Sequence, residues 1–157
     1  MDKNDIYFMK RAILRAKAAA KCGEVPIGAV IVKDGEIVAT GRNMRELRKN
    51  SLLHAEIIAI DRACKRLGRW RLHDCTLYVT MEPCPMCAGA IVNSRIKRVV
   101  YGCYDQKAGA LGTVFDMSQY PLNHKYEITS GVMEQECAKL LSNFFAELRK
   151  RPKGNKQ

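Results

Sequence analysis

Hydrophobic residues recur along this chain with two periods, that of an α-helix and the shorter repeat of β-strands. The first helical pattern covers residues 4–21, and Gly23 follows it where a helix C-terminus favours glycine. We expect this helix to pack on a sheet. Further helices are expected at residues 54–67, 84–94 and 133–149. The last helix has an apolar stripe that consists of Met133, Cys137, Leu140, Leu141, Phe144, Phe145 and Leu148.

The strand signals begin with a hairpin at residues 26–42, where Asp34-Gly35 separates two runs rich in β-branched residues. Gly28 lies in the first run, and its missing side chain predicts either the close approach of another group or a bulge. Further strands are expected at residues 75–80, 98–101 and, with a weaker signal, 125–130.

Strands and helices alternate after the hairpin, which is typical of an α/β fold. Two successive strand-helix-strand passages predict parallel neighbouring strands with right-handed crossovers. The connection at residues 103–120 is too long for a simple joint, so we expect it to be functional or to pack over a site. We expect a single domain over residues 1–150 and a flexible basic tail over residues 151–157.

The composition is that of a soluble globular protein, with 47% hydrophobic and 27% charged residues and no apolar run of membrane-spanning length. No secretory signal follows the N-terminus, and the seven cysteines are scattered apart from one close pair. These features predict reduced thiols in a cytoplasmic protein without a membrane partner.

The formal net charge is +11, and residues 149–157 hold only five of the 27 Lys and Arg residues, so the folded body is basic as well. Such a field favours a polyanion such as nucleic acid, although surface charge also serves solubility. The loop at residues 42–53 carries four basic residues and could either line an anionic channel or face solvent.

Candidate chemistry is concentrated in residues 80–90, Thr-Met-Glu-Pro-Cys-Pro-Met-Cys-Ala-Gly-Ala, together with His54-Ala-Glu56 upstream. Cys84 and Cys87 can present two thiolates from one helical turn, and His54 can add an imidazole. Three such ligands leave one tetrahedral position open for water, as a catalytic zinc requires. The cysteine pair alone also fits a thioredoxin-like redox site or a structural zinc.

His54 and Glu56 favour catalytic zinc over these two alternatives. Redox exchange gives them no role, and a structural zinc needs a fourth ligand at short spacing, whereas the nearby His73 and Cys75 only open a strand. Both His54 and Glu56 fall at a helix N-terminus, which stabilises a developing anion. If zinc is present, Glu56 takes the proton of the activated water and returns it to the substrate ring and then to the leaving amine.

The chain closely resembles the tRNA-specific adenosine deaminases of the cytidine deaminase-like superfamily. The zinc motif marks the superfamily, and further segments in family order point to the tRNA branch. These segments are Glu24-Val-Pro-Ile-Gly-Ala-Val, Gly41-Arg-Asn43, His54-Ala-Glu56-Ile, the run from Thr76 to Ala90, Ser94-Arg-Ile, Asp105-Gln-Lys-Ala-Gly, Leu122-Asn-His and the closing Leu-Leu-Ser-Asn-Phe-Phe.

The resemblance implies a three-layer α/β/α cytidine deaminase-like fold with a central mixed sheet of about five strands. It implies hydrolytic conversion of the wobble adenosine in the anticodon of tRNA(Arg) to inosine, through zinc-activated hydroxide attack on C6 and release of ammonia. The implied partners are the tRNA anticodon stem-loop and a second subunit of a homodimer, which helps to build each site. One Zn²⁺ per subunit is implied, and no organic cofactor.

Carried over residue by residue, the resemblance assigns His54, Cys84 and Cys87 as zinc ligands and Glu56 as the proton shuttle. The substrate-binding residues that it implies are Asn43, Ala55, Asp105, Lys107, Asn123 and Phe145. The chain departs from the family ahead of the histidine, where Ser51-Leu52-Leu53 replaces smaller residues. We expect the core to absorb the two leucines, although they could instead reshape the base pocket.

Three functions are therefore compared. Deamination of the wobble adenosine is favoured by the basic charge and by the match of the C-terminal helix. A deaminase of a free nucleobase or nucleoside, of the guanine or cytosine type, would not need a net charge of +11. A non-catalytic, zinc-stabilised RNA-binding module would leave Glu56 dispensable.

Overall fold

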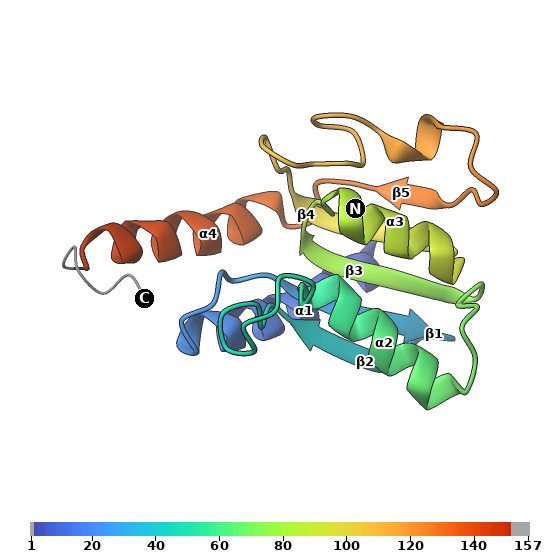
Figure 1. Cartoon of the computed structure of the whole chain (residues 1–157), viewed down its shortest axis with the longest axis horizontal. Coiled ribbons are helices and arrows are strands. Elements are labelled where there is room, and N and C mark those ends of the chain that lie inside the picture. The colour runs from blue at the N-terminus through green and yellow to red at the C-terminus, as the bar shows by residue number, and fades with distance from the viewer. Residues whose placement is uncertain (1, 152–157) are drawn as a thin grey trace.

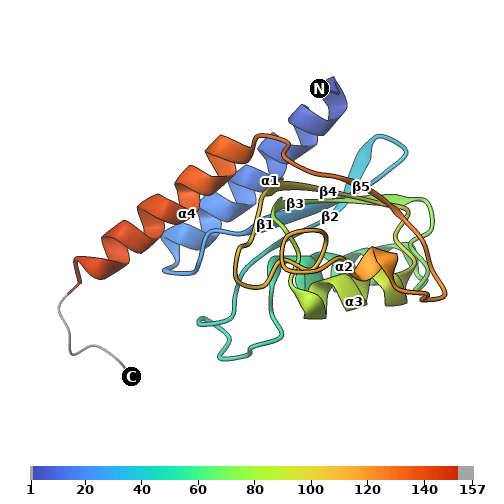
Figure 2. The ribbon, with the colours of Figure 1, turned by 90° about the horizontal axis from the view of Figure 1, so that it is seen from above.

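The computed structural model describes residues 2–151 and has three layers, with a mixed sheet between two pairs of helices (Figures 1 and 2). Helices α1 (Lys3–Lys21) and α4 (Glu134–Arg149) cover one face of the sheet. Helices α2 (Ala55–Leu67) and α3 (Pro85–Ser94) cover the other face. The predicted three-layer α/β/α architecture is confirmed.

The sheet has five strands in the order β2-β1-β3-β4-β5. Strand β1 is antiparallel to both of its neighbours, whereas β3, β4 and β5 are mutually parallel. A short 3-10 helix, η1 (Met117–Gln119), lies in the long connection before β5. The strands are β1 (Gly28–Lys33), β2 (Glu36–Arg42), β3 (Cys75–Met81), β4 (Arg98–Cys103) and β5 (Glu127–Thr129).

The predicted hairpin is confirmed, because β1 and β2 pair around a turn in which Asp34 and Gly35 both have positive φ. The prediction for the passage β3-α3-β4 is also correct, since these two strands are parallel neighbours. For the passage β2-α2-β3 it is wrong, because β1 lies between the two strands. The reason is that β1 is almost entirely buried, so it takes the inner position while its hairpin partner occupies the edge.

Both faces of the sheet are buried, and alternate residues of one strand enter two separate cores. Ile31 and Val79 pack beneath α2 and α3, whereas Val30 and Tyr78 pack beneath α1 and α4. The first helix therefore packs on the sheet, as its apolar pattern predicts.

Two glycines of the hairpin seat one helix on each face. A Cβ at Gly28 would collide with the backbone of α1 at Ala12 and Ala16, and a Cβ at Gly41 would collide with the backbone of α2 at Ala55. The close approach predicted at Gly28 is thus present, and the irregular pairing in the hairpin falls further along β1 instead. Because Gly41 has no side chain, the first turn of α2 can lie against β2. This contact sets the position of the helix start, where His54 is the N-cap.

The C-terminal helix packs on the sheet through its first turns. Cys137 in its second turn is buried, but Phe145 and Leu148 are 40% and 43% exposed, because the later turns run beyond the sheet (Figures 1 and 2). The apolar stripe of α4 is thus buried near its start and exposed toward its end.

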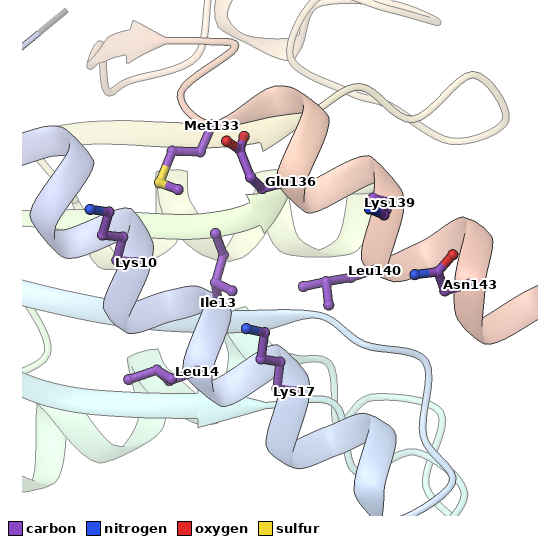
Figure 3. A pocket seen from close by; sticks show the side chains of 9 residues that line it. All are labelled: Lys10, Ile13, Leu14, Lys17, Met133, Glu136, Lys139, Leu140 and Asn143. Carbon is purple, nitrogen blue, oxygen red and sulfur yellow. The ribbon is translucent and has the colours of Figure 1, made fainter.

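A groove of about 440 Å³ opens between α1 and α4 on this face (Figure 3). Its apolar floor includes Ile13 and Leu140, and lysines stand on its rim. No set of metal-ligating side chains gathers there, because Glu136 is its only carboxylate and neither His nor Cys lines it.

The predicted basic tail, apart from Arg151, lies outside the described residues. Among the helices of residues 2–151, none has both the length and the apolar character needed to cross a membrane.

A nearly buried carboxylate joins α1 to the sheet. Asp5 accepts hydrogen bonds from Nη1 and Nη2 of Arg98 at 2.8 and 2.7 Å, and from the hydroxyl of Tyr78 at 2.8 Å. The same guanidinium donates to Thr129 on β5, so one ion pair connects α1, β3, β4 and β5. The Arg98 guanidinium lowers the pKa of Asp5 below its ordinary value.

Replacing Asp5 with asparagine should lower the free energy of unfolding by about 2 kcal/mol at neutral pH, because the Arg98 charge loses its partner. A carboxyl with a depressed pKa stabilises the fold above its unfolded pKa, and this contribution disappears as pH falls through the folded value. The difference between D5N and the parent should therefore shrink in acid. Urea unfolding at several pH values measures it, and Asp34→Asn, at an exposed ion pair, is the control expected to change little.

Candidate active site

Two helix N-termini meet on one side of the sheet. His54 is the N-cap of α2, and Cys84 is the N-cap of α3. Neither side chain makes a capping hydrogen bond, so both point elsewhere. Cys87 follows in the first turn of α3, after Pro85, whose missing donor costs nothing at that position. Both helices thus begin one residue later than predicted.

The side chains of His54, Cys84 and Cys87 converge. Their ligand atoms all lie within 4.8 Å of one another, and Nδ1 of His54 is 3.6 Å from each Sγ. Within residues 2–151 this is the single group of three or more His, Cys, Asp or Glu that could hold a metal ion. His73 instead contacts Arg69, and Cys75 is buried at the start of β3, so neither supplies a fourth ligand.

The three groups change one another's protonation. The Cys87 thiol and the His54 imidazole lower the pKa of Cys84 to about 4. Conversely, Cys84 raises the pKa of Cys87 and that of His54. Two sulfur atoms and an imidazole nitrogen are the donors that zinc takes in proteins, and the positive ends of two helix dipoles favour the thiolate forms of the two cysteines. The residues present therefore fit a zinc ion with three protein ligands.

Glu56 lies in the first turn of α2, and its carboxyl group is close enough to Cys87 for each group to shift the pKa of the other. The residue is only 4% exposed, and burial raises its pKa to about 7. It does not belong to the ligand group. The structure thus places a carboxyl group beside the candidate metal position without making it a ligand.

A small pocket of about 100 Å³ opens next to His54. Asn43 is nearly buried in its wall, where its side chain donates to the Val25 carbonyl and accepts from the Arg45 amide. The lining residues are Val25, Ile27, Asn43, Arg45, His54 and Ala55. The structure therefore brings Asn43 and Ala55 together with the ligand group.

Buried Glu24 holds the loop that follows Asn43. Its carboxylate accepts from the backbone amides of Glu46 and Leu47 at 2.9 and 2.8 Å, and the residue is 1% exposed. Sequence reasoning did not give Glu24 a role of its own. A glutamate in the short segment that leads into an apolar strand is the signal that could have drawn attention to it.

Asp105 and Lys107 lie on the loop after β4. Oδ1 of Asp105 accepts from the amides of Lys107 and Ala108, so this side chain shapes its own loop, while Lys107 is exposed. Buried Glu82, two residues before Cys84, accepts hydrogen bonds from this loop and was also missed. The long connection thus packs against the segment that leads into the ligand pair.

Comparison with known proteins identifies the family. The MafB19-like deaminase family matches residues 1–149. A tRNA-specific adenosine deaminase of Bacillus subtilis (strain 168) is 54% identical over 154 residues, which cover 98% of this chain and 95% of the relative. This chain belongs to the tRNA-specific adenosine deaminase family.

Solved structures agree with this family. The structure of a tRNA:A34 deaminase, from a study of A-to-I editing at the wobble position of transfer RNA, has a TM-score of 0.82 and 43% identity. The match covers 86% of this chain and 99% of the chain in that structure. A guanine deaminase from Bacillus subtilis has a TM-score of 0.62 and 32% identity, with both chains covered in full. The cytidine deaminase-like fold is confirmed.

Two of the expected substrate residues of this deaminase lie apart from the ligand group. Asn123 is exposed on a separate groove over the outer side of α3, together with Gly89 and Leu122. Phe145 stands on the part of α4 that runs beyond the sheet (Figure 1). Within one chain, neither residue joins the pocket beside His54.

The leucines ahead of His54 do not both enter the core of the deaminase. Leu52 is 56% exposed and Leu53 is half-buried, so the expectation that the core absorbs them is wrong for Leu52. The backbone explains this result, because the amide of Leu52 bonds to the Asn50 side chain in a turn that directs the residue outward.

The metal fit can be tested without an activity assay. We expect the purified deaminase to hold about one zinc ion per chain and Cys87→Ser to reduce this content well below half, because a thiolate ligand is lost. Cys22→Ser changes an exposed thiol outside the group and should keep the zinc. Elemental analysis after dialysis measures both, and equal zinc contents in the two variants would show that the ligand assignment is wrong.

Proposed function

We propose that this protein hydrolyses the wobble adenosine in the anticodon of tRNA(Arg) to inosine. The observation that carries the proposal is the 54% identity to a tRNA-specific adenosine deaminase over nearly the full length of both chains. Identity to the guanine deaminase is 32%. In the reaction, water replaces the exocyclic amine at C6 of the base, and ammonia leaves.

His54, Cys84 and Cys87 would hold one Zn²⁺ per subunit. When bound, zinc supplies a Lewis acid that makes a water molecule nucleophilic at neutral pH. The remaining steps belong to the protein. Helix α2 holds Glu56 in a buried position, where bulk solvent does not compete for its carboxyl group. Glu56 carries a proton from the attacking water molecule to the ring nitrogen and then to the leaving amine.

The small pocket beside His54 suits the reacting base. Asn43 and Ala55 line its wall, and the amide group of Asn43 can donate to and accept from the edge of a base. Asp105 and Lys107 would contact the nucleotides that flank the adenosine. Lys107 is exposed and cationic, so it can approach phosphate.

The partners in this proposal are the tRNA anticodon stem-loop and a second copy of the chain. A net charge of +11 supports a polyanionic substrate. Asn123 and Phe145 lie away from the ligand group of their own chain, and contact with the neighbouring subunit's substrate would give them a role. The proposal includes a single deaminase domain over residues 1–150 and a cytoplasmic protein that needs no organic cofactor.

Deamination of a free purine is the second candidate, because the chain is also similar to a guanine deaminase over its full length. The two candidate functions differ in how much of the protein surface must contact the substrate. A free base requires only the pocket beside His54, whereas an anticodon loop also requires the basic loops around it.

Glu56→Ala should lower the rate of inosine formation on a tRNA(Arg) anticodon stem-loop by at least about a hundredfold, because the carboxyl group that carries the proton is removed. Zinc content and stem-loop binding should be retained. Glu36→Ala, at an exposed position in the hairpin, is the matched control and should keep full activity. Inosine is measured by nuclease digestion and chromatography.

Free guanine and free cytosine are tested in parallel with the stem-loop. Turnover of a free base without any inosine in the stem-loop would replace the proposed substrate with the second candidate. Undiminished inosine formation by Glu56→Ala would refute the role of Glu56 in proton transfer.

A further inference from the structure

Glu82 lies at the junction between β3 and α3, and its carboxylate is buried beneath the loop after β4. The residue is 3% exposed. Among residues 2–151, no cation reaches its oxygen atoms at salt-bridge distance, and its charge is balanced by hydrogen-bond donors of this loop instead. A buried carboxylate is stable only when such donors surround it, so its position and the conformation of the loop depend on each other.

The carboxylate of Glu82 joins the two ends of the loop. Oε1 accepts from the amide of Asp105 at 3.2 Å and from the hydroxyl of Thr113. Oε2 accepts from the amides of Leu111 and Thr113, both at 3.1 Å. Asp105 and Thr113 are thereby tied to one point, which lies two residues before Cys84.

The backbone around Glu82 reinforces this arrangement. The amide of Glu82 donates to the Cys103 carbonyl, and the Pro83 carbonyl accepts from the amide of Ala110. Gly109 passes so close to the carboxylate that a Cβ there would contact its carbon and both oxygens at 2.5 Å. The loop therefore lies directly on the chain segment that delivers Cys84 to the ligand group.

We propose that Glu82 is a positioning residue, which acts through Asp105 to place the loop after β4 beside the candidate active site. Asp105 transmits the constraint, because its own Oδ1 fixes the amides of Lys107 and Ala108. This inference rests on the proposed function, in which Asp105 and Lys107 contact the RNA. Glu82 itself touches neither the metal position nor the substrate.

The isosteric change Glu82→Gln should weaken the hydrogen bond to Asp105 and keep those to the amides of Leu111 and Thr113. An amide group has only one acceptor oxygen, and its NH₂ end cannot face a backbone amide. The hydroxyl of Thr113 can accept a hydrogen bond as well as donate one, so it tolerates a neighbouring NH₂ group. The NH₂ group of the glutamine should therefore take the Oε1 position, where it repels the amide of Asp105. Amide hydrogen exchange should accelerate at Asp105 and stay slow at Leu111 and Thr113.

Kinetics on the tRNA(Arg) anticodon stem-loop should show a change in RNA binding rather than in the chemical step. We expect E82Q to raise KM about tenfold while kcat changes less than about threefold, because the chemical groups stay in place and only the RNA contact is displaced. Zinc content should equal that of the parent. Glu36→Gln makes the same chemical change at an exposed position and should alter none of these values.

A second variant keeps the test decisive if E82Q does not fold. Thr113→Val removes one hydroxyl donor and leaves the three amide hydrogen bonds, so KM should rise about threefold. Unchanged KM in the folded variants would overturn the proposal. Loss of zinc with a fall in kcat alone would overturn it too, because Glu82 would then support the ligand group rather than the loop.

Failure of the proposed function remains distinguishable from failure of this inference. If the parent protein makes no inosine, the proposed substrate is wrong, while amide exchange at Asp105 still shows whether Glu82 holds the loop. If the parent is active and exchange at Asp105 is the same in parent and E82Q, the inference is wrong and the proposed function stands.

Discussion

The candidate site depends on one constraint, which is that the N-termini of α2 and α3 meet above the same end of the sheet. Strand β1 separates β2 from β3, so α2 crosses from the sheet edge to an inner strand and its first turn comes to lie beside α3. The bare backbone at Gly41 lets α2 lie close enough to the hairpin for this contact. His54 and Cys84 then occupy equivalent N-cap positions and face each other.

The loops around this centre are held by buried carboxylates as well as by apolar packing. Glu24 binds the loop that follows Asn43, and Glu82 binds the loop that carries Asp105. In both cases the donors are mainly backbone amides, so the loop sequence can vary while its course is kept. Polar, basic side chains such as Lys107 can therefore remain on the surface although the backbone beneath them is ordered.

Local chemistry explains which features could be predicted from the sequence. The turn at Asp34 and Gly35 and the ligands Cys84 and Cys87 follow from short-range rules for hairpins and metal spacing. The insertion of β1 between β2 and β3 and the clamp at Glu82 depend on contacts between distant segments, and no residue pattern records them. The outward course of Leu52 is set by a side chain–backbone turn that hydrophobicity does not predict.

The meeting of the two N-termini also has a consequence for folding. His54 and Cys84 are 30 residues apart in the sequence and belong to different helices, so an ion bound by both and by Cys87 would cross-link the start of α2 to the start of α3. Such an ion would bind the native chain far better than the unfolded chain, and the free energy of unfolding would rise with the logarithm of its free concentration. Metal supply would thereby help to set the fraction of the chain that is folded.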